Sequence, residues 1–266
     1  MIRDDHRYDV PPVDGPPPRD RRVGDRPPGD GPPGDPPVDD RPVVVPATAG
    51  GPWERPPGEV AVPVGPARLT GRLVLPPGAG SLVVLAHGSG CSRYSPRNRH
   101  LAAALGRAGL GTLLLDLLTS GEERAPDALF DIPLLAGRLS ETTRWLARET
   151  GLPVGLLGAG TSAGAVLEAA AGDGGVHAVV CCGGRPDLAG PAALARVRAP
   201  TLFVVGALDA RVLGLNRLAA GRLRCEHRLA VVPGATRLFT EPGALEAVAR
   251  LAAGWFTAHR PRPAMV

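Results

Sequence analysis

The sequence of 266 residues has few aromatic side chains, 3% of the total, and no lysine at all. Its 30 arginines outnumber the 26 acidic residues and give a net charge of +4 at pH 7. That excess would suit a nucleic-acid partner, but acidic residues are interspersed with the arginines throughout. No dense basic cluster with interleaved aromatic residues occurs, so we expect no nucleic-acid binding.

Long hydrophobic runs are also missing. None approaches the roughly 18 apolar residues that span a bilayer, and the start, MIRDDHRYDV, lacks the apolar centre of a signal peptide. The four cysteines, Cys91, Cys181, Cys182 and Cys225, show no C-x-x-C spacing. We therefore expect a cytoplasmic protein with reduced thiols, without a membrane contact, a metal site or a cofactor.

Residues 1–57 are mostly proline, glycine, aspartate and arginine, as in DVPPVDGPPPRDRRVGDRPPGDGPPGDPPVDDRP. Such a segment has too little apolar surface to offset the entropy lost on ordering, and proline disrupts helices and sheets. We predict a disordered tail with polyproline stretches. An SH3-like domain could bind such stretches, but a solvated tail is the simpler interpretation, and no tail partner is assigned. Residues 58–260 suffice for one α/β domain.

Strand and helix patterns alternate after residue 57. The runs EVAVPV and ARLTGRLVLP predict a hairpin, and Ser95-Pro96 predicts the start of a helix that runs to about residue 108. Further helices are expected at 131–150, from Ser162, at 213–223 and near the end. Buried strands are expected at SLVVLA, GTLLLD, PVGLLG, HAVVCC, PTLFVVG and HRLAVVPG. This order predicts a mostly parallel sheet with helices on both faces and reactive groups at the carboxyl ends of its strands.

The stretch GLLGAGTSAG, residues 155–164, ends a strand and begins a helix, and it allows three interpretations. It contains G-x-S-x-G centred on Ser162, a turn that can present a nucleophilic serine. It also contains G-x-G-x-x-A from Gly158, a dinucleotide-binding turn. That second interpretation is disfavoured because the strand lies in mid-sheet and the next strand ends in Cys181-Cys182-Gly183 without an acidic residue. In the third interpretation, Gly160 occupies the place of a former nucleophile.

Several segments occur in an order that points to a known family. They are LVVLAHGSGCSRYSPRNR, FDIPLL, the turn at 158–164, and VVPGATRLFTEPG before the last helix. From about residue 58 to 259 the chain resembles the α/β-hydrolase superfamily, most closely its dienelactone-hydrolase-like branch. The resemblance implies the α/β-hydrolase fold and hydrolysis of a small carboxylic ester or lactone. Members can be fused to a phosphoribosyltransferase domain, but an acidic pair followed by Thr-Gly is missing, so none is expected here.

The resemblance assigns roles to two loops. Asp209, in VVGALDARV, occupies the position of the acid that orients the catalytic histidine, although it could instead cap a helix before Val212. His87, Gly88 and Ser89, in AHGSG, match the loop whose amides help to form the oxyanion hole, together with Thr161 after the turn. We interpret His87 as a packed residue at a strand end rather than as a proton shuttle.

The other two catalytic positions are changed. Aligning the strand PVGLLGA places Gly160 at the nucleophile position, where it has no side chain to attack a substrate. Ser162 lies two residues later, and two residues of helix rotate a side chain by about 200°. A slip of the glycine-rich turn could restore Ser162, and otherwise Ser162 caps the first helical turn. Arg237 stands at the histidine position and cannot accept a proton, although it could bind a carboxylate or phosphate or pair with Asp209.

No substitute for these residues is evident. His177 and His227 begin their strands at the wrong end of the sheet, His259 ends the last helix, and His100 is conceivable but poorly placed. The cysteines lie outside the nucleophile position. We therefore predict impaired or lost triad chemistry, with Ser162 attacking an ester or lactone if activity remains. The alternative is a non-catalytic protein that binds a small molecule or anion near Arg237, Asp209 and Arg185.

Overall fold

The computed structural model describes residues 58–87, 93–172 and 174–261. These residues all belong to the second of the two units into which the chain divides, 41–266. The tail predicted at residues 1–57 lies outside the described residues, as do Gly88, Ser89 and Cys91. No helix within the described ranges is long and apolar enough to cross a membrane.

An eight-stranded sheet, with strand order β1-β2-β4-β3-β5-β6-β7-β8, forms the centre of the domain. Its strands pair in parallel, except that β2 runs antiparallel to both of its neighbours, β1 and β4. Every strand predicted from the sequence is present, and the predicted fold class is confirmed. The bounds are β1 Gly58–Val64, β2 Ala67–Val74, β3 Leu82–His87, β4 Gly111–Asp116, β5 Val154–Ala159, β6 Val176–Cys182, β7 Thr201–Gly206 and β8 His227–Val232.

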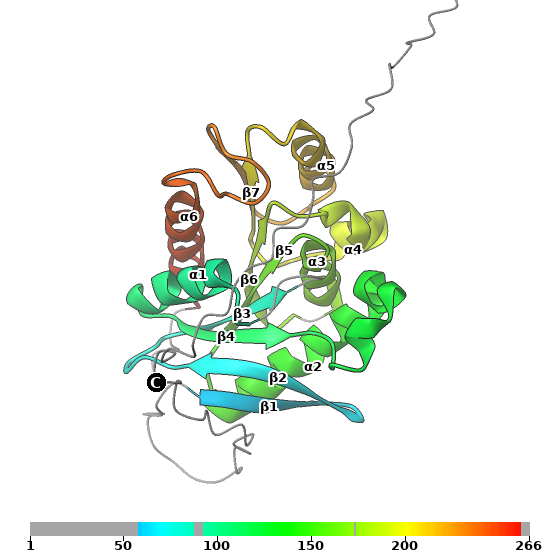
Figure 1. Cartoon of the computed structure of the whole chain (residues 1–266), viewed down its shortest axis with the longest axis vertical. Helices are drawn as coiled ribbons and strands as arrows, with labels where there is room; N and C mark the ends of the chain where they lie inside the picture. The colour runs from blue at the N-terminus through cyan, green and yellow to red at the C-terminus, as the bar shows by residue number, and fades with distance from the viewer. Residues whose placement is uncertain (1–57, 88–92, 173, 262–266) are drawn as a thin grey trace, which may run out of the picture. The chain divides into compact units, whose positions relative to one another are not determined.

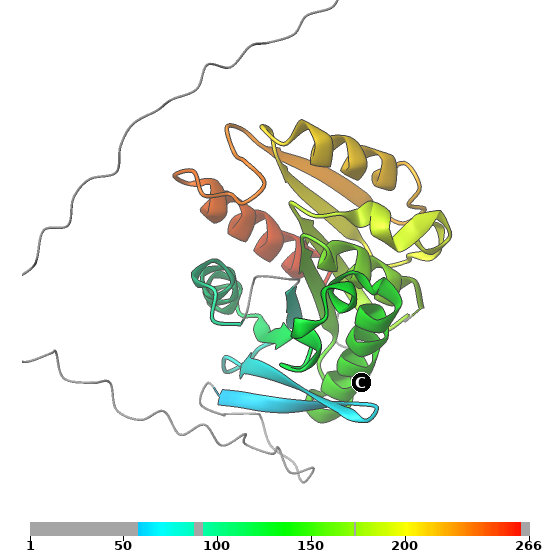
Figure 2. The same cartoon turned by 45° about the vertical axis from the view of Figure 1, so that its right-hand side comes forward.

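Helices cover both faces of this sheet. α1 and α6 pack together on one face, whereas α2 and α3 pack together on the other (Figures 1 and 2). The α-helices are α1 Pro96–Arg107, α2 Ile132–Thr150, α3 Ser162–Gly172, α4 Gly190–Arg196, α5 Ala210–Ala220 and α6 Ala244–Ala258. Short 3₁₀ segments are η1 Glu122–Arg124, η2 Pro126–Phe130 and η3 Pro186–Ala189.

The continuous apolar runs of the sequence become strands that are buried on both sides. Every residue of β3, β4 and β7 is buried. Because successive side chains of a strand point to opposite faces, Val84 packs in the cluster with Leu139 of α2, whereas Leu85 packs with Phe256 of α6. The two layers of helix therefore each seal one face, and only the ends of the strands remain available for a site.

Three local predictions need correction. Ser95 does precede α1, but its side chain makes no capping hydrogen bond, and the first-turn proline alone matches the expectation. The helix predicted at 213–223 begins at Ala210, because the Asp209 carboxylate caps it by accepting from the Val212 amide at 3.1 Å. Helical spacing predicts an apolar face of Leu245, Val248, Leu251, Ala252 and Trp255 on α6, whereas the buried residues are Ala244, Val248, Ala249, Ala252 and Phe256, with Leu245, Leu251 and Trp255 only partly buried beside them.

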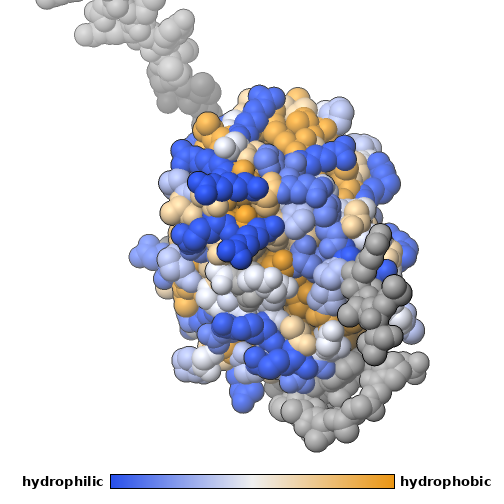
Figure 3. Space-filling view, turned by 180° about the vertical axis from the view of Figure 1, so that it is seen from behind, coloured by the Kyte–Doolittle hydropathy of each residue, from blue (hydrophilic) through white to orange (hydrophobic). Residues whose placement is uncertain are grey.

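The surface mixes hydrophilic and hydrophobic residues. Figure 3 shows hydrophilic side chains interspersed with hydrophobic ones on the side opposite to the view of Figure 1. Among the described residues, six large apolar side chains are exposed: Tyr94, Phe130, Leu208, Leu218, Val231 and Leu238. Two of them, Phe130 and Leu238, lie at the rim of the pocket described next.

Candidate functional site

A cavity of about 540 Å³ lies at the carboxyl ends of the central strands, the edge at which sheets of this type bind ligands. Chain segments far apart in the sequence meet there because parallel strands all end at this edge. The lining residues are His87, Arg97, Phe130, Ala159, Gly160, Thr161, Cys182, Gly183, Arg185, Asp209, Arg211, Val212, Leu215, Arg237 and Leu238. The pocket therefore contains the acid, nucleophile and histidine positions that the sequence singled out.

The turn between β5 and α3 contains Gly160, which the sequence predicts to stand at the nucleophile position. Gly160 lies in the left-handed region with φ +60°, and a Cβ built on it would meet nothing within 4 Å. Side chains other than that of glycine rarely adopt this conformation. A side chain at residue 160 would project into the open pocket, but glycine carries only a hydrogen atom there.

Close contacts fix the register of this turn. A Cβ on Gly158 would lie 2.6 Å from the carbonyl oxygen of Ser162, and one on Gly184 would lie 2.3 Å from Cβ of Ala163. The amide of Arg185 also donates to the carbonyl oxygen of Gly160 at 2.9 Å. The turn is therefore held on both sides, with Ser162 inside the first turn of α3 and not at its tip.

Ser162 is completely buried, with 0% of its surface exposed. Its hydroxyl accepts a hydrogen bond from the Ala159 amide at 3.0 Å. It also lies 2.9 Å from the carbonyl oxygen of Ala86 and 2.7 Å from that of Ala159, and it can donate to either. The side chain thus joins the ends of β3 and β5. It neither lines the pocket nor caps α3, so its geometry is that of a structural serine.

Asp209 caps a helix, which was one of the two roles that the sequence left open. It is partly buried, caps α5 through the Val212 amide, and also lines the pocket. Arg237 is exposed and lies in the loop after β8 on the same pocket. Within the described ranges no ion pair joins Arg237 to Asp209. Arg237 is thus an exposed residue of the pocket lining, and a guanidinium can bind a carboxylate or phosphate.

Positive charge dominates the described lining of the pocket. It contains four arginines and a single carboxylate, that of Asp209. Arg185 is partly neutralised, because its guanidinium donates to both carboxylate oxygens of Asp187, at 2.8 and 2.7 Å. Arg97 and Arg211 were missed in the sequence. Both lie in the first turn of a helix, directly after a loop at the carboxyl edge of the sheet. That position in the sequence could have identified them as pocket residues.

His87 ends β3 beneath the pocket and is 8% exposed. Burial, aided by the nearby positive charge of Arg97, lowers its pKa to about 4, so the imidazole is neutral at pH 7. Its Nε2 atom has no hydrogen-bond partner among the described residues. The side chain is packed as expected, but one polar atom is left without a described partner next to the cavity.

The other nucleophiles and bases are unsuitable. Cys182 lines the pocket, but burial raises the pKa of its thiol to about 12, so the thiolate is scarce at pH 7. Burial also raises the pKa of the Cys181 thiol. His100 lies 3.9 Å from Glu246 between α1 and α6, outside the residues that line the pocket. The remaining described histidines, His177, His227 and His259, lie toward the opposite end of the sheet or at the end of α6.

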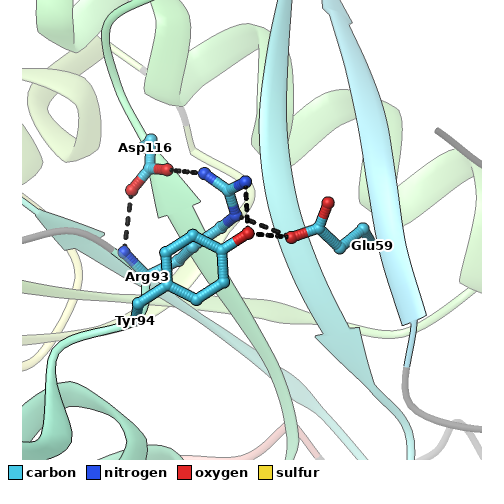
Figure 4. A network of polar contacts seen from close by, with 4 residues as sticks. All are labelled: Glu59, Arg93, Tyr94 and Asp116. Atoms are coloured by element: carbon cyan, nitrogen blue, oxygen red, sulfur yellow. Dashed lines mark hydrogen bonds and ion pairs between the residues drawn. The ribbon is translucent and has the colours of Figure 1, made fainter. Parts of the chain in front are cut away.

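A polar network beside the site anchors the segment that leads into α1 (Figure 4). Arg93 donates through its amide to Asp116 at 2.9 Å, and its guanidinium bonds the other carboxylate oxygen of Asp116. The same guanidinium donates to Glu59 at 3.0 Å, and the Tyr94 hydroxyl donates to Glu59 at 2.6 Å. These contacts join β1, β4 and the chain that emerges beside the pocket, and they were not anticipated from the sequence.

Comparisons with known proteins agree with this architecture. No protein-family model matches the sequence. A solved dienelactone hydrolase from Anabaena variabilis is 51% identical, with a TM-score of 0.74 over 77% of this chain and 99% of that one. Est1E from Butyrivibrio proteoclasticus shares the fold alone, with 13% identity and a TM-score of 0.66 over 76% of this chain and 98% of that chain.

A curated relative from Mycobacterium tuberculosis, strain H37Rv, is 53% identical over 205 residues and carries the provisional name phosphoribosyl transferase. The match covers 76% of this chain but only 46% of the relative, so the chain spans about half the length of that protein. The likeness to the solved hydrolase, in contrast, extends over nearly all of that enzyme. By its sheet, its turn after β5 and this similarity, the chain belongs to the dienelactone-hydrolase-like family of α/β-hydrolase-fold proteins.

Proposed function

We propose that this chain binds a small organic anion in the arginine-lined pocket and does not perform the triad hydrolysis of its fold. The observation that carries the proposal is the turn after β5. Gly160 faces the pocket without a side chain, while the hydroxyl of Ser162 is buried and bonded to backbone groups. An ester hydrolysed by a serine triad needs a nucleophile in the cavity, and neither residue supplies one.

The base is missing as well. Arginine stays protonated at any accessible pH, so Arg237 cannot take a proton from a hydroxyl or a water. His87 is the one histidine that lines the pocket within the described residues, and its pKa of about 4 makes it a weak base. Asp209 then has no histidine to orient. Hydrolysis of an ester or lactone through Ser162 is the competing function, and it requires that this turn rearrange.

The pocket suits an anion of modest size. Its four arginines outnumber its single carboxylate, so the lining attracts negative charge, and a volume of about 540 Å³ lies in the range of pockets that enclose small molecules. Phe130, Leu215 and Leu238 add apolar surface to the same lining. A ligand with a charged group and an apolar body would therefore match both kinds of surface.

The provisional name of the longer Mycobacterium tuberculosis relative suggests one further ligand to test. A phosphoribosyl group carries phosphate on a polar sugar, so ribose 5-phosphate belongs in the panel as a phosphate without an apolar body. It would bind to the arginines but gain nothing from Phe130 or Leu238. This comparison separates recognition of charge alone from recognition of charge and apolar surface together.

Two measurements test the proposal. The first is intact mass after incubation with a fluorophosphonate probe, for the wild type and for Ser162→Ala; we expect no adduct on either. The second is calorimetric titration of the wild type with aryl carboxylates, phenyl phosphate and ribose 5-phosphate. We expect binding of at least one anion that weakens with added salt, because attraction by exposed guanidinium groups is screened.

The outcomes separate the two functions. Rapid labelling of the wild type that disappears in Ser162→Ala would refute the proposal and establish Ser162 as the nucleophile. Absence of labelling together with absence of binding across the anion panel would also refute it, because the pocket would then recognise neither an ester nor an anion. Absence of labelling with salt-sensitive binding would support it.

A further inference from the structure

We propose that a second site, at the amino edge of the sheet, binds a compact diphosphate. The site is a cavity of about 660 Å³, called here the amino-edge cavity, which the proposed function does not use. Its lining comes from the end of α3 before β6, the end of α4 before β7, and the turn before β8. These parallel strands all begin at this edge, so the first pocket lies at their other end. The six residues of β7, at about 3.3 Å each, put roughly 20 Å between the two edges.

Positive charge gathers at the amino-edge cavity. Three exposed arginines line it, Arg196, Arg198 and Arg224. The described lining contains no carboxylate, and Asp173, which lies between two lining glycines in the sequence, is outside the described residues. Guanidinium groups that are brought together repel one another, and a bound anion with several charges removes that cost. The cavity therefore favours a multiply charged anion.

The helix ends beside the cavity account for only one of these arginines. The carboxyl end of a helix carries partial negative charge, which a basic residue in the last turn offsets. Arg196 is that residue in α4, and its guanidinium also lies 3.8 Å from Glu168. Arg198 and Arg224 lie outside the helices and form no ion pair with a described residue. These two guanidinium groups are the ones that a ligand can use.

The rest of the lining favours a compact ligand. Apart from the arginines it consists of alanine, glycine, valine and one cysteine, so the described lining offers no aromatic ring on which a nucleobase could stack. A guanidinium forms paired, charge-assisted hydrogen bonds with phosphate oxygens. A diphosphate presents two linked phosphoryl groups, which matches the two arginines that lack a partner. Inorganic pyrophosphate is the smallest molecule with this chemistry, and it is the probe used below.

Cys225 reports whether the amino-edge cavity is occupied. Its side chain is partly buried and lines the cavity together with the arginines. The test measures the rate at which a neutral maleimide alkylates Cys225 in the full chain, by peptide mass, as pyrophosphate is added. We expect the rate to fall by half at the Kd and roughly tenfold at about ten times that concentration, because only the empty cavity reacts.

Matched charge reversals assign the effect to this cavity. Arg224→Glu should raise the pyrophosphate concentration that protects Cys225 by at least about tenfold, because a charge-assisted contact is lost. Arg250→Glu is the control, since Arg250 is exposed on α6, lines neither cavity and changes the net charge equally. Arg237→Ala, in the first pocket, should leave the protection of Cys225 unchanged. Urea midpoints check that each variant is folded.

The possible results bear on this site alone. An alkylation rate that pyrophosphate leaves unchanged would overturn the inference and leave the proposed function standing, because that function concerns the first pocket. Equal weakening in Arg224→Glu and Arg250→Glu would overturn it too, since attraction by the net charge would then suffice. Protection that occurs only in Asp173→Asn would also overturn it, because the chain's own carboxylate would then neutralise the arginines.

Two competing anions test the class of ligand. ADP carries the same diphosphate with a nucleoside attached, and citrate carries several carboxylates in a compact molecule. We expect both to protect Cys225 only at higher concentrations than pyrophosphate does. Protection by either one at a lower concentration would overturn the choice of a compact diphosphate. If Arg224→Glu fails to fold, Arg198→Glu makes the same change at the same cavity and takes its place.

Discussion

A serine at residue 160 and a histidine at residue 237, the positions that the sequence predicts for nucleophile and base, should together create an activated serine. The double variant Gly160→Ser with Arg237→His would place a hydroxyl at the tip of the turn and an imidazole in the loop after β8, both on the pocket that Asp209 lines. We expect each single variant to react slowly at most, since one lacks a base and the other lacks a nucleophile. Only the double variant should react rapidly with a fluorophosphonate, because the residues of a triad act as a unit.

The structure indicates that the fold tolerates this change. Serine at a φ of +60° costs about 1–2 kcal/mol of backbone strain, and no steric cost adds to it because a Cβ at residue 160 would meet nothing within 4 Å. Marginal stabilities of roughly 5–15 kcal/mol can absorb such a loss. General-base assistance contributes about 10²–10⁴-fold in rate, so the double variant should label at least about a hundredfold faster than Gly160→Ser alone.

The assay is the time course of intact mass, followed by peptide mapping of the adduct. Urea denaturation of all variants provides the control for folding, with Gly151→Ser as a second left-handed glycine far from the pocket. A folded double variant that stays unlabelled would refute the assignment of Gly160 and Arg237 to the nucleophile and base positions. An adduct mapped to Ser162 in any variant would refute the structural role given to that residue.

Three further predictions concern stability. Ser162→Ala should lower the free energy of unfolding by about 1–3 kcal/mol, because a buried hydrogen-bonded hydroxyl is lost. Stability should fall as the pH drops from about 6.5 toward 4, since burial lowers the pKa of His87 and of His177 to about 4. The unfolded chain then binds more protons, which costs about 1.4 kcal/mol per pH unit for each imidazole. Arg93→Ala should cost about 3 kcal/mol, because the nearly buried Asp116 carboxylate loses its guanidinium partner and keeps only the backbone amide of residue 93.

Each of these has a control measured by urea unfolding. The loss of stability in Ser162→Ala should be the same in the presence and absence of a fluorophosphonate. A urea midpoint equal to that of the wild type would contradict the structural role of Ser162. For the pH effect, His177→Phe should flatten the dependence below pH 6.5, whereas the same change at the exposed His227 should not. For Arg93, the comparison is Arg196→Ala, whose exposed pair with Glu168 should contribute under about 1 kcal/mol. Equal losses in the two arginine variants would refute the importance of the network.

Much of the fold was predictable because its strands are continuous apolar runs bounded by glycine, proline and aspartate. Helix starts were less predictable. The capping aspartates at residues 131 and 209 both accept from the amide three residues later. The helix predicted at 131–150 started at the first of them, whereas the one predicted at 213–223 started too late, although a cap before Val212 was one of the two roles considered for Asp209. Asp209 had two plausible roles, and a sequence pattern cannot show that one carboxylate both caps a helix and lines a pocket.

The site was predictable in outline and not in its contacts. Gly160 and Arg237 could be placed from the order of motifs, and the structure brings both to one cavity. The Ser162 hydroxyl bonds to the carbonyl oxygen of Ala86, which is 76 residues earlier in the chain. Local sequence spacing cannot predict such a pair. The same limit applies to the link between Glu59 and Arg93, which are 34 residues apart.

The two substitutions gain meaning when they are considered together. In a hydrolase the donors near the turn stabilise an oxyanion that exists only in the transition state, and a nucleophile side chain fills the space above them. If residues 160 and 237 are the nucleophile and histidine positions, as the sequence predicts, glycine at residue 160 leaves that space open to a stable anion, and the permanent charge of Arg237 favours an anion in the ground state. The same donors would then bind a ligand instead of accelerating a reaction. Gly160→Ser should therefore weaken anion binding even where it creates no activity, and unchanged affinity would show that the anion lies elsewhere in the pocket.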